Sequence, residues 1–184
     1  GSFTSIGASP QDMHYNGEPT ELIIGDDNQI REYVSIHRGT VAGKGKTFIG
    51  NSNMIMAYCH IAHDCIIGNH VIMANVATLA GHVEVGDHVN LGGFVGVHQF
   101  CRIGAFSYVG GLSGIGLDVP PYVIISGIRS RMRISGINKI GMRRSGMSRE
   151  SVNKLENAFK IIFRSPQLLL KDALAKVQEE IPES

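Results

Sequence analysis

The chain has 184 residues, a formal net charge of +1 and 18% charged residues. This length supports one sizeable hydrophobic core with a small appendage, but not two full domains. The charge is nearly balanced and there is no run of about 18 apolar residues, so the composition indicates neither nucleic-acid binding nor stable membrane insertion. The chain opens with Gly-Ser and no Met. We interpret this start as a cloning scar and expect the chain to be a fragment.

The dominant pattern is an apolar residue at every sixth position from residue 49 onward. This is the hexapeptide signature of a β-helix, in which short strands are joined by turns and every sixth residue points to the axis. Three hexads form one triangular coil of 18 residues, and coils stack about 4.8 Å apart by strand pairing. The leading positions are Ile49, Ile55, Ile61, Ile67, Met73, Leu79, Val85, Leu91, Val97, Ile103, Val109 and Ile115.

Two further positions of the repeat have a regular character. A small or β-branched residue stands four positions after most leading residues, and we assign it to a second inward-facing column. Glycine often follows the leading residue, and we assign it to the turns. Cys59, Cys65 and Cys101 all lie in the inward column and form no CxxC pair. We therefore expect them to be core residues and not a disulfide framework or a zinc site.

The phase of the repeat changes once. Ile24, Ile30 and Ile36 have the same six-residue period as the later hexads but a different register. An insertion near 41–46 accounts for the difference and is predicted to loop out.

The period stops near residue 126. We therefore predict a hexapeptide β-helix over 1–126 and a C-terminal helical region over 127–184 that covers the last coil. Ser148 is a candidate N-cap for a helix that ends near Arg164. Ser165-Pro166 resembles a second helix start, with an apolar face formed by Leu169, Leu170, Ala173 and Val177.

Column arithmetic predicts a cluster of polar side chains. Residues 18 positions apart share a column, which aligns His63 with Gly81 and Gln99, and Asp64 with His82. Histidine is the natural general base near neutral pH, and an adjacent carboxylate can set its tautomer. A glycine N–H one coil away can stabilise an oxyanion, so the combination indicates acyl transfer to a hydroxyl or an amine. These residues alone leave open the alternative that they are solvated corner residues.

The residues around this cluster carry a family resemblance. The runs HIAHDC, ANVATLAGHVEVGD, GGFVGVHQFCRIGA and VPPYVI, together with PQDMHYNGEPT and IREYVSIHRGT nearer the N-terminus, strongly resemble the UDP-N-acetylglucosamine O-acyltransferase family. The match extends from Phe3 to about Arg164. Members of that family usually carry further β-helix coils at the N-terminus, which agrees with an N-terminally truncated chain.

The resemblance implies a left-handed parallel β-helix that assembles as a cytoplasmic homotrimer with sites between subunits. It implies transfer of an (R)-3-hydroxyacyl chain from acyl carrier protein to the 3-hydroxyl of UDP-N-acetylglucosamine, the first step of lipid A biosynthesis. No separate cofactor is expected, since the acyl donor is carried on the phosphopantetheine of acyl carrier protein.

The resemblance also assigns roles to individual residues. His63 matches the general base, Asp64 its carboxylate partner and Gly81 the oxyanion donor. The positions that match substrate-binding residues are Asp12, His60, His82, His98, Gln99, Asn138 and Arg144. Met56, Gly93 and Gly111 match the acyl-chain groove, and glycine at position 111 implies a long acyl chain.

Ten Lys or Arg residues but only two acids lie between residues 128 and 164. This basic stretch is either a solvated surface or a docking surface for acidic acyl carrier protein, with Arg129, Arg131 and Arg133 as candidates.

Three other functions stay open. One is another hexapeptide acyltransferase, either a 3-amino-sugar N-acyltransferase or a CoA-dependent acetyltransferase. A second is a metalloenzyme resembling the γ-type carbonic anhydrases, although their usual pair of His five residues apart is missing here. We therefore predict no metal site. A third is a scaffold that assembles but does not catalyse.

Overall fold

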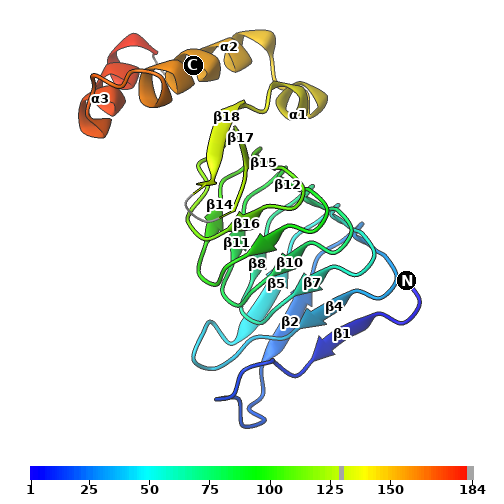
Figure 1. Ribbon diagram of the computed structural model, residues 1–184. Coiled ribbons are helices and arrows are strands. Elements are labelled where there is room, and N and C mark those ends of the chain that lie inside the picture. Colours follow the sequence, from blue (N-terminus) through cyan, green and yellow to red (C-terminus); the bar gives the residue numbers. More distant parts are fainter. Residues whose placement is uncertain (129–130, 182–184) are drawn as a thin grey trace.

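The computed structural model describes residues 1–128 and 131–181. Most of it is a triangular prism of short parallel strands that coil around one axis (Figure 1). The first side of the prism, which we call sheet A, contains β1 (Ser5–Ala8), β4 (Ser35–His37), β7 (His60–Ile61), β10 (Thr78–Leu79), β13 (Gly96–Val97) and β16 (Gly114–Ile115).

The other two sides are built in the same way. Sheet B contains β2 (Glu21–Ile24), β5 (Lys46–Ile49), β8 (Ile66–Ile67), β11 (Glu84–Val85) and β14 (Arg102–Ile103). Sheet C contains β3 (Gln29–Ile30), β6 (Met54–Ile55), β9 (Ile72–Met73), β12 (Asn90–Leu91), β15 (Tyr108–Val109), β17 (Val123–Ser126) and β18 (Arg133–Ile137). The chain visits the sheets in the order A, B, C, so it forms three corners: A–B, B–C and C–A.

The core lies along the axis, as the repeat predicts. All twelve leading positions from Ile49 to Ile115 are buried, as are the three cysteines in the second inward column. Burial raises the pKa of Cys59 to about 11 and that of Cys65 to about 12, so both remain thiols at neutral pH. The predicted column spacing is also confirmed, because Thr78 pairs with His60 on one side and with Gly96 on the other.

The glycines have a different role from the one that the sequence suggested. The corner residues with a left-handed backbone are not glycines: Asp64 has a φ of 60°, His82 of 62° and Phe100 of 66°. Glycine instead follows the leading residue where coils approach closely. At Gly104 an added Cβ would lie 2.4 Å from the backbone nitrogen of Pro121 in the next coil. Close packing between coils, and not φ, therefore demands glycine at position 104.

The insertion changes the spacing of the early coils. Ser35 pairs with His60, 25 positions later, where the regular repeat gives 18. The extra residues form a loop over 41–45, and β5 begins at Lys46. Val34 and Ile36 before the loop are buried like the inward positions after it, whereas Ile24 and Ile30 are only partly buried.

Three helices follow the prism, beyond β18 at the end opposite the N-terminus (Figure 1). They are α1 (Lys139–Arg144), α2 (Arg149–Phe163) and α3 (Leu170–Glu180). Strand β18 pairs antiparallel with β17, and α2 contacts β18. Ser148 caps α2 as predicted, since its hydroxyl accepts a hydrogen bond from the Ser151 N–H.

The second predicted helix start is wrong. Ser165 does not cap a helix. Its hydroxyl donates to the Lys160 carbonyl just after the end of α2, and α3 starts only at Leu170. Of the predicted apolar face of α3, Ala173 is buried, but Leu169 and Leu170 are exposed. Within the described ranges, no helix combines the length and the apolar character needed to cross a membrane.

The close approach of coils gives a testable consequence. We expect Gly104→Ala to lower the free energy of unfolding by about 1–3 kcal/mol, because the new methyl group meets the backbone at Pro121. Gly116→Ala is the matched control, since a Cβ there has open space. It should leave stability unchanged or raise it by up to about 1 kcal/mol. Denaturant unfolding at equal protein concentration measures both, and equal losses would contradict the explanation.

Candidate active site

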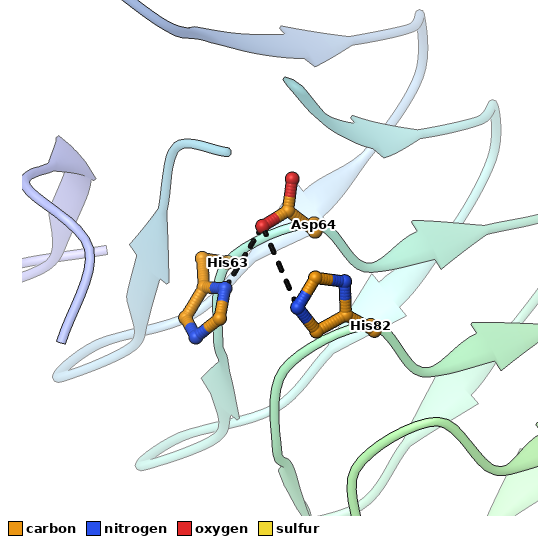
Figure 2. A group of neighbouring side chains, drawn as sticks. All are labelled: His63, Asp64 and His82. Carbon is orange, nitrogen blue, oxygen red and sulfur yellow. Dashed lines mark hydrogen bonds and ion pairs between the residues drawn. The ribbon is translucent and has the colours of Figure 1, made fainter. Parts of the chain in front are cut away.

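Three polar side chains meet at the A–B corner, from two successive coils (Figure 2). The Nδ1 atom of His63 lies 2.9 Å from Oδ2 of Asp64, and Nε2 of His82 lies 3.9 Å from the same oxygen. The backbone N–H of His82 donates to the backbone carbonyl of His63, and this hydrogen bond holds the two coils in register. The predicted neighbours of this cluster therefore do come together, because the 18-residue coil stacks them.

Asp64 is the buried centre of the cluster. Its side chain has no exposed surface, whereas the imidazoles of His63 and His82 are partly exposed. Burial by itself would raise the pKa of Asp64, but the hydrogen bonds from the Thr40 hydroxyl, from His63 and from the Thr40 N–H hold the pKa below its usual value. Asp64 is therefore ionised at neutral pH and accepts a hydrogen bond from the His63 ring.

Gly81 lies directly beside the His63 ring. A Cβ added to Gly81 would lie 2.6 Å from Cε1 and 2.8 Å from Nε2 of His63, so only glycine lets the ring lie here. Within residues 1–128 and 131–181, the Gly81 N–H donates no hydrogen bond. The structure thus places a free backbone donor near the ring nitrogen that does not contact Asp64.

Two further histidines lie on sheet A beside this corner. The His60 Nδ1 is 2.7 Å from the Ser35 hydroxyl, and its ring packs edge-on against His37. Burial, with smaller contributions from His37 and His63, lowers the pKa of His60, and burial likewise lowers the pKa of His37. Both imidazoles are therefore neutral in the folded protein at pH 7.

The other predicted site residues at the A–B corner are His98, Gln99 and Asp12. His98 and Gln99 lie on the coil after Gly81, and Nδ1 of His98 is 3.2 Å from the Gln99 carbonyl oxygen. Asp12 contacts His14, whose N–H and ring lower the pKa of Asp12; His63 adds a smaller lowering contribution. On the other side of the corner a cavity of about 200 Å³ is lined by Lys44, Asp64, His82, Glu84, Phe100 and Arg102.

The other predicted site residues lie elsewhere on this chain. Met56, Gly93 and Gly111 are at the C–A corner, where sheet C leads into sheet A. Asn138 and Arg144 line a cavity of about 860 Å³ between sheet C and α1. Asn138 is also the N-cap of α1, because its Oδ1 accepts from Gly141 N–H and its amide donates to the Phe106 carbonyl. One chain therefore distributes the predicted residues over three separate places.

The sequence interpretation missed residues that hold Asp64. Thr40 donates to the carboxylate through both its N–H and its hydroxyl, and Thr47 accepts from the Asp64 N–H. A polar residue at the inward position 40, otherwise apolar or small in the repeat, was the available signal. His37 was also missed, and nothing in the repeat marks it.

Comparison with known proteins gives the class first. Residues 46–81 match the family model described as bacterial transferase hexapeptide (six repeats), and residues 118–184 match that described as UDP N-acetylglucosamine O-acyltransferase, domain 2. A relative from Thermodesulfovibrio yellowstonii named acyl-[acyl-carrier-protein]–UDP-N-acetylglucosamine O-acyltransferase is 57% identical over 98% of this chain and 69% of its own length. A relative of the same name from Halorhodospira halophila is 52% identical over 99% of this chain and 69% of its own length.

Solved structures lead to the same family as the sequence relatives. A UDP-N-acetylglucosamine acyltransferase from Bacteroides fragilis superposes with a TM-score of 0.92 at 42% identity, covering 99% of this chain and 70% of its own. These matches confirm the predicted left-handed parallel β-helix. The chain belongs to the UDP-N-acetylglucosamine O-acyltransferase family, as its motifs predicted.

The same cluster offers ligand atoms to a cation. One ligand atom each from His63, Asp64 and His82 lies within 4.8 Å of the others. However, the Asp64 carboxylate already accepts hydrogen bonds from Thr40, Lys44 and His63. A metal ion would have to displace these donors, so the donor set does not fit a metal centre of the γ-carbonic-anhydrase kind, which is built from three histidines.

We expect the purified protein to hold much less than one equivalent of transition metal per chain. Plasma mass spectrometry after gel filtration gives the metal content, and zinc titration calorimetry gives the affinity. His63→Ala is the control for any zinc that binds elsewhere. Stoichiometric metal in the parent and none in the variant would contradict the expectation.

The buried histidines predict acid sensitivity. The pKa values of His37 and His60 are lowered from 6.5, so the unfolded chain binds protons that the folded chain does not. Stability should therefore fall as the pH decreases below about 6.5, while the contribution of Asp64 is lost only below about 3.8.

Thermal unfolding between pH 7.5 and 5 measures this loss. His37→Asn should reduce it, whereas His14→Asn, at a side chain that is 86% exposed, should show the same loss as the parent. An unchanged loss in His37→Asn would show that another group is responsible.

Proposed function

We propose that this chain transfers an (R)-3-hydroxyacyl group from acyl carrier protein to the 3-hydroxyl of UDP-N-acetylglucosamine, the first step of lipid A biosynthesis. The names of its relatives supply the reaction class, the acyl carrier and the sugar nucleotide. The observation that carries the mechanism is the 2.9 Å contact between Nδ1 of His63 and the fully buried Asp64 carboxylate. This contact keeps the ring proton on Nδ1 and leaves Nε2 as the base.

The reaction proceeds in two steps at His63. Nε2 takes the proton of the sugar 3-hydroxyl while the hydroxyl oxygen attacks the thioester carbonyl carbon. The negative charge that forms on the carbonyl oxygen is stabilised by the Gly81 N–H. When the tetrahedral intermediate collapses, the carbon–sulfur bond breaks and His63 returns the proton to the leaving thiolate. The acyl donor is carried by acyl carrier protein, so the reaction uses no separate cofactor.

Substrate contacts are assigned to the residues around the A–B corner and to the nucleotide end of the site. These residues are Asp12, His60, His82, His98, Gln99, Asn138 and Arg144. Arg144 suits a diphosphate, because its guanidinium presents a fixed fork of donors. Met56, Gly93 and Gly111 form the acyl groove, and Gly111 leaves that groove open for a long chain.

A homotrimer brings these residues together. On one chain the catalytic cluster lies at the A–B corner, the acyl-groove residues at the C–A corner, and Asn138 beside sheet C. The C–A corner also exposes large apolar side chains, including Phe94 and Leu112. A second copy that covers this corner buries that apolar surface and completes the site.

Acyl carrier protein docks on the basic surface after the β-helix. Arg133 lies on β18 and Arg131 just before it, and Arg143 lies in the last turn of α1. Arg129, also part of this prediction, lies outside the described residues. Complementary charge speeds the encounter with an acidic partner. The site of action is cytoplasmic, where acyl carrier protein supplies the donor.

A mass-spectrometric acyl-transfer assay tests the function. The donors are 3-hydroxyacyl carrier proteins of several chain lengths, and the acceptors are UDP-N-acetylglucosamine and its 3-amino analogue. We expect an ester product from the long donors, and a rate about 10²–10⁴-fold lower in His63→Ala. Glu179→Ala is the control, an exposed residue on α3 that contacts none of the assigned site residues.

The acceptor panel separates the alternatives. Product only with the 3-amino analogue would replace the O-acyltransferase with an N-acyltransferase. Full activity in His63→Ala would reject the assigned base, and product only from acetyl-CoA would reject the acyl carrier protein donor.

A further inference from the structure

The loop over 41–45 does not extend freely into solvent; it closes over Asp64. The carboxylate accepts hydrogen bonds from the Thr40 hydroxyl at 2.7 Å, from the Thr40 N–H at 3.0 Å and from the Lys44 N–H at 3.2 Å. Two donors from Thr40, the residue just before the loop, and one from Lys44 within it therefore face this carboxylate, in addition to His63.

The loop also fits Asp64 sterically. A Cβ added to Gly43 would lie 2.3 Å from Cγ of the Asp64 carboxyl. The Gly43 N–H donates to the Thr40 hydroxyl at 3.2 Å, which closes the loop on itself. The Lys44 ammonium, 3.0 Å from Glu84, links the far end of the loop to β11, two strands away from β5 in sheet B.

The backbone of Asp64 departs from the regular corner. His82 and Phe100 both have a left-handed backbone, and the backbone N–H of each donates to the carbonyl of the residue 19 positions earlier. At Asp64 the insertion interrupts that pattern, and the N–H donates instead to the Thr47 hydroxyl at 2.9 Å. Thr47 is fully buried, so this bond holds the strained φ of Asp64 from inside the prism.

We propose that Thr40 and Thr47, with the loop over 41–45, form a clamp that positions the Asp64 carboxylate against Nδ1 of His63, and that the rate of acyl transfer depends on it. Both threonines are positioning residues, since neither touches the reacting atoms. The inference rests on the proposed function, because it assigns His63 as the base. Its structural half, the control of Asp64, stands independently of turnover.

The charges around Asp64 leave the clamp as a main source of stabilisation. His63 and His82 face the carboxylate at the A–B corner, from two successive coils. Across the small cavity, Lys44 and Arg102 both lie near Glu84, at 3.0 and 3.8 Å, so Glu84 offsets part of their positive charge. The adjacent Cys65 is a neutral thiol, because burial raises its pKa to about 12. Loss of the Thr40 hydroxyl should therefore raise the pKa of Asp64.

Thr40→Val and Thr40→Ser form the decisive pair. Valine keeps the shape but removes the hydroxyl, and serine restores it. We expect Thr40→Val to lower kcat about 10- to 100-fold with little change in the KM for UDP-N-acetylglucosamine. The reason is that the variant loses a hydrogen bond to a charged group that does not contact the substrate. The acid limb of its pH profile should move to higher pH, and Thr40→Ser should recover most of kcat. Thr4→Val, whose hydroxyl donates to the Arg31 carbonyl, is the control for hydroxyl loss away from the site.

A carbon-13 titration of the aspartate carboxyls provides a readout without turnover. Thr40→Val should raise the pKa of Asp64, while Thr4→Val should not. Thr47→Val serves as the second variant if Thr40→Val does not fold; it should lower kcat and leave the titration of Asp64 nearly unchanged, since all the carboxylate donors remain.

The two failures can be distinguished. Parental kcat and an unmoved Asp64 titration in Thr40→Val would overturn the clamp while leaving acyl transfer intact. If the parent itself forms no product, the proposed function fails, and the titration alone then decides whether the loop controls Asp64.

Discussion

The stacking of one coil on the next is the constraint on which the rest of this structure depends. Inward aliphatic side chains bury apolar surface along one axis, and each strand donates hydrogen bonds to the coil beside it. A slip of one residue would turn an inward side chain outward, so the register is strongly specified. The columns that result bring Asp64 and His82 together from different coils. The candidate site is thus a direct consequence of how the core packs.

The polar residues of the candidate site lie at the corners of the prism, outside the apolar core. Asp64 and His82 have a left-handed backbone that is unfavourable for a non-glycine residue. A backbone hydrogen bond to the preceding coil offsets this cost at His82, and a hydrogen bond to the Thr47 hydroxyl offsets it at Asp64. Their side chains project away from the axis, so polar groups gather there without entering the apolar core. A buried, ionised carboxylate needs additional donors, however, and a regular corner supplies few of them. Thr40, just before the insertion, and Lys44, within it, provide those donors.

Local signals explain which predictions succeeded. Ser148 caps α2 because N-capping depends only on the next few residues. Ser165 was misread because the same residue type can end a helix: its hydroxyl donates back to Lys160, a contact that no local pattern distinguishes. The glycines were found by their spacing, but the reason for them was not. The backbone contact next to Gly104 comes from the following coil, and only the stacked structure reveals it.

By itself, the sequence determined the hexapeptide period, the inward columns, the family motifs and the pairing of His63 with Gly81 and of Asp64 with His82. These follow from a repeat whose geometry is the same in every coil, so spacing converts directly into proximity. Only the tertiary structure decided that the loop over 41–45 closes on Asp64, and that the residues predicted for the acyl groove and for the nucleotide lie at separate places on one chain. The physical reason is that an insertion has no period. Its conformation is set by the carboxylate it contacts and by the coil it crosses, not by the repeat it interrupts.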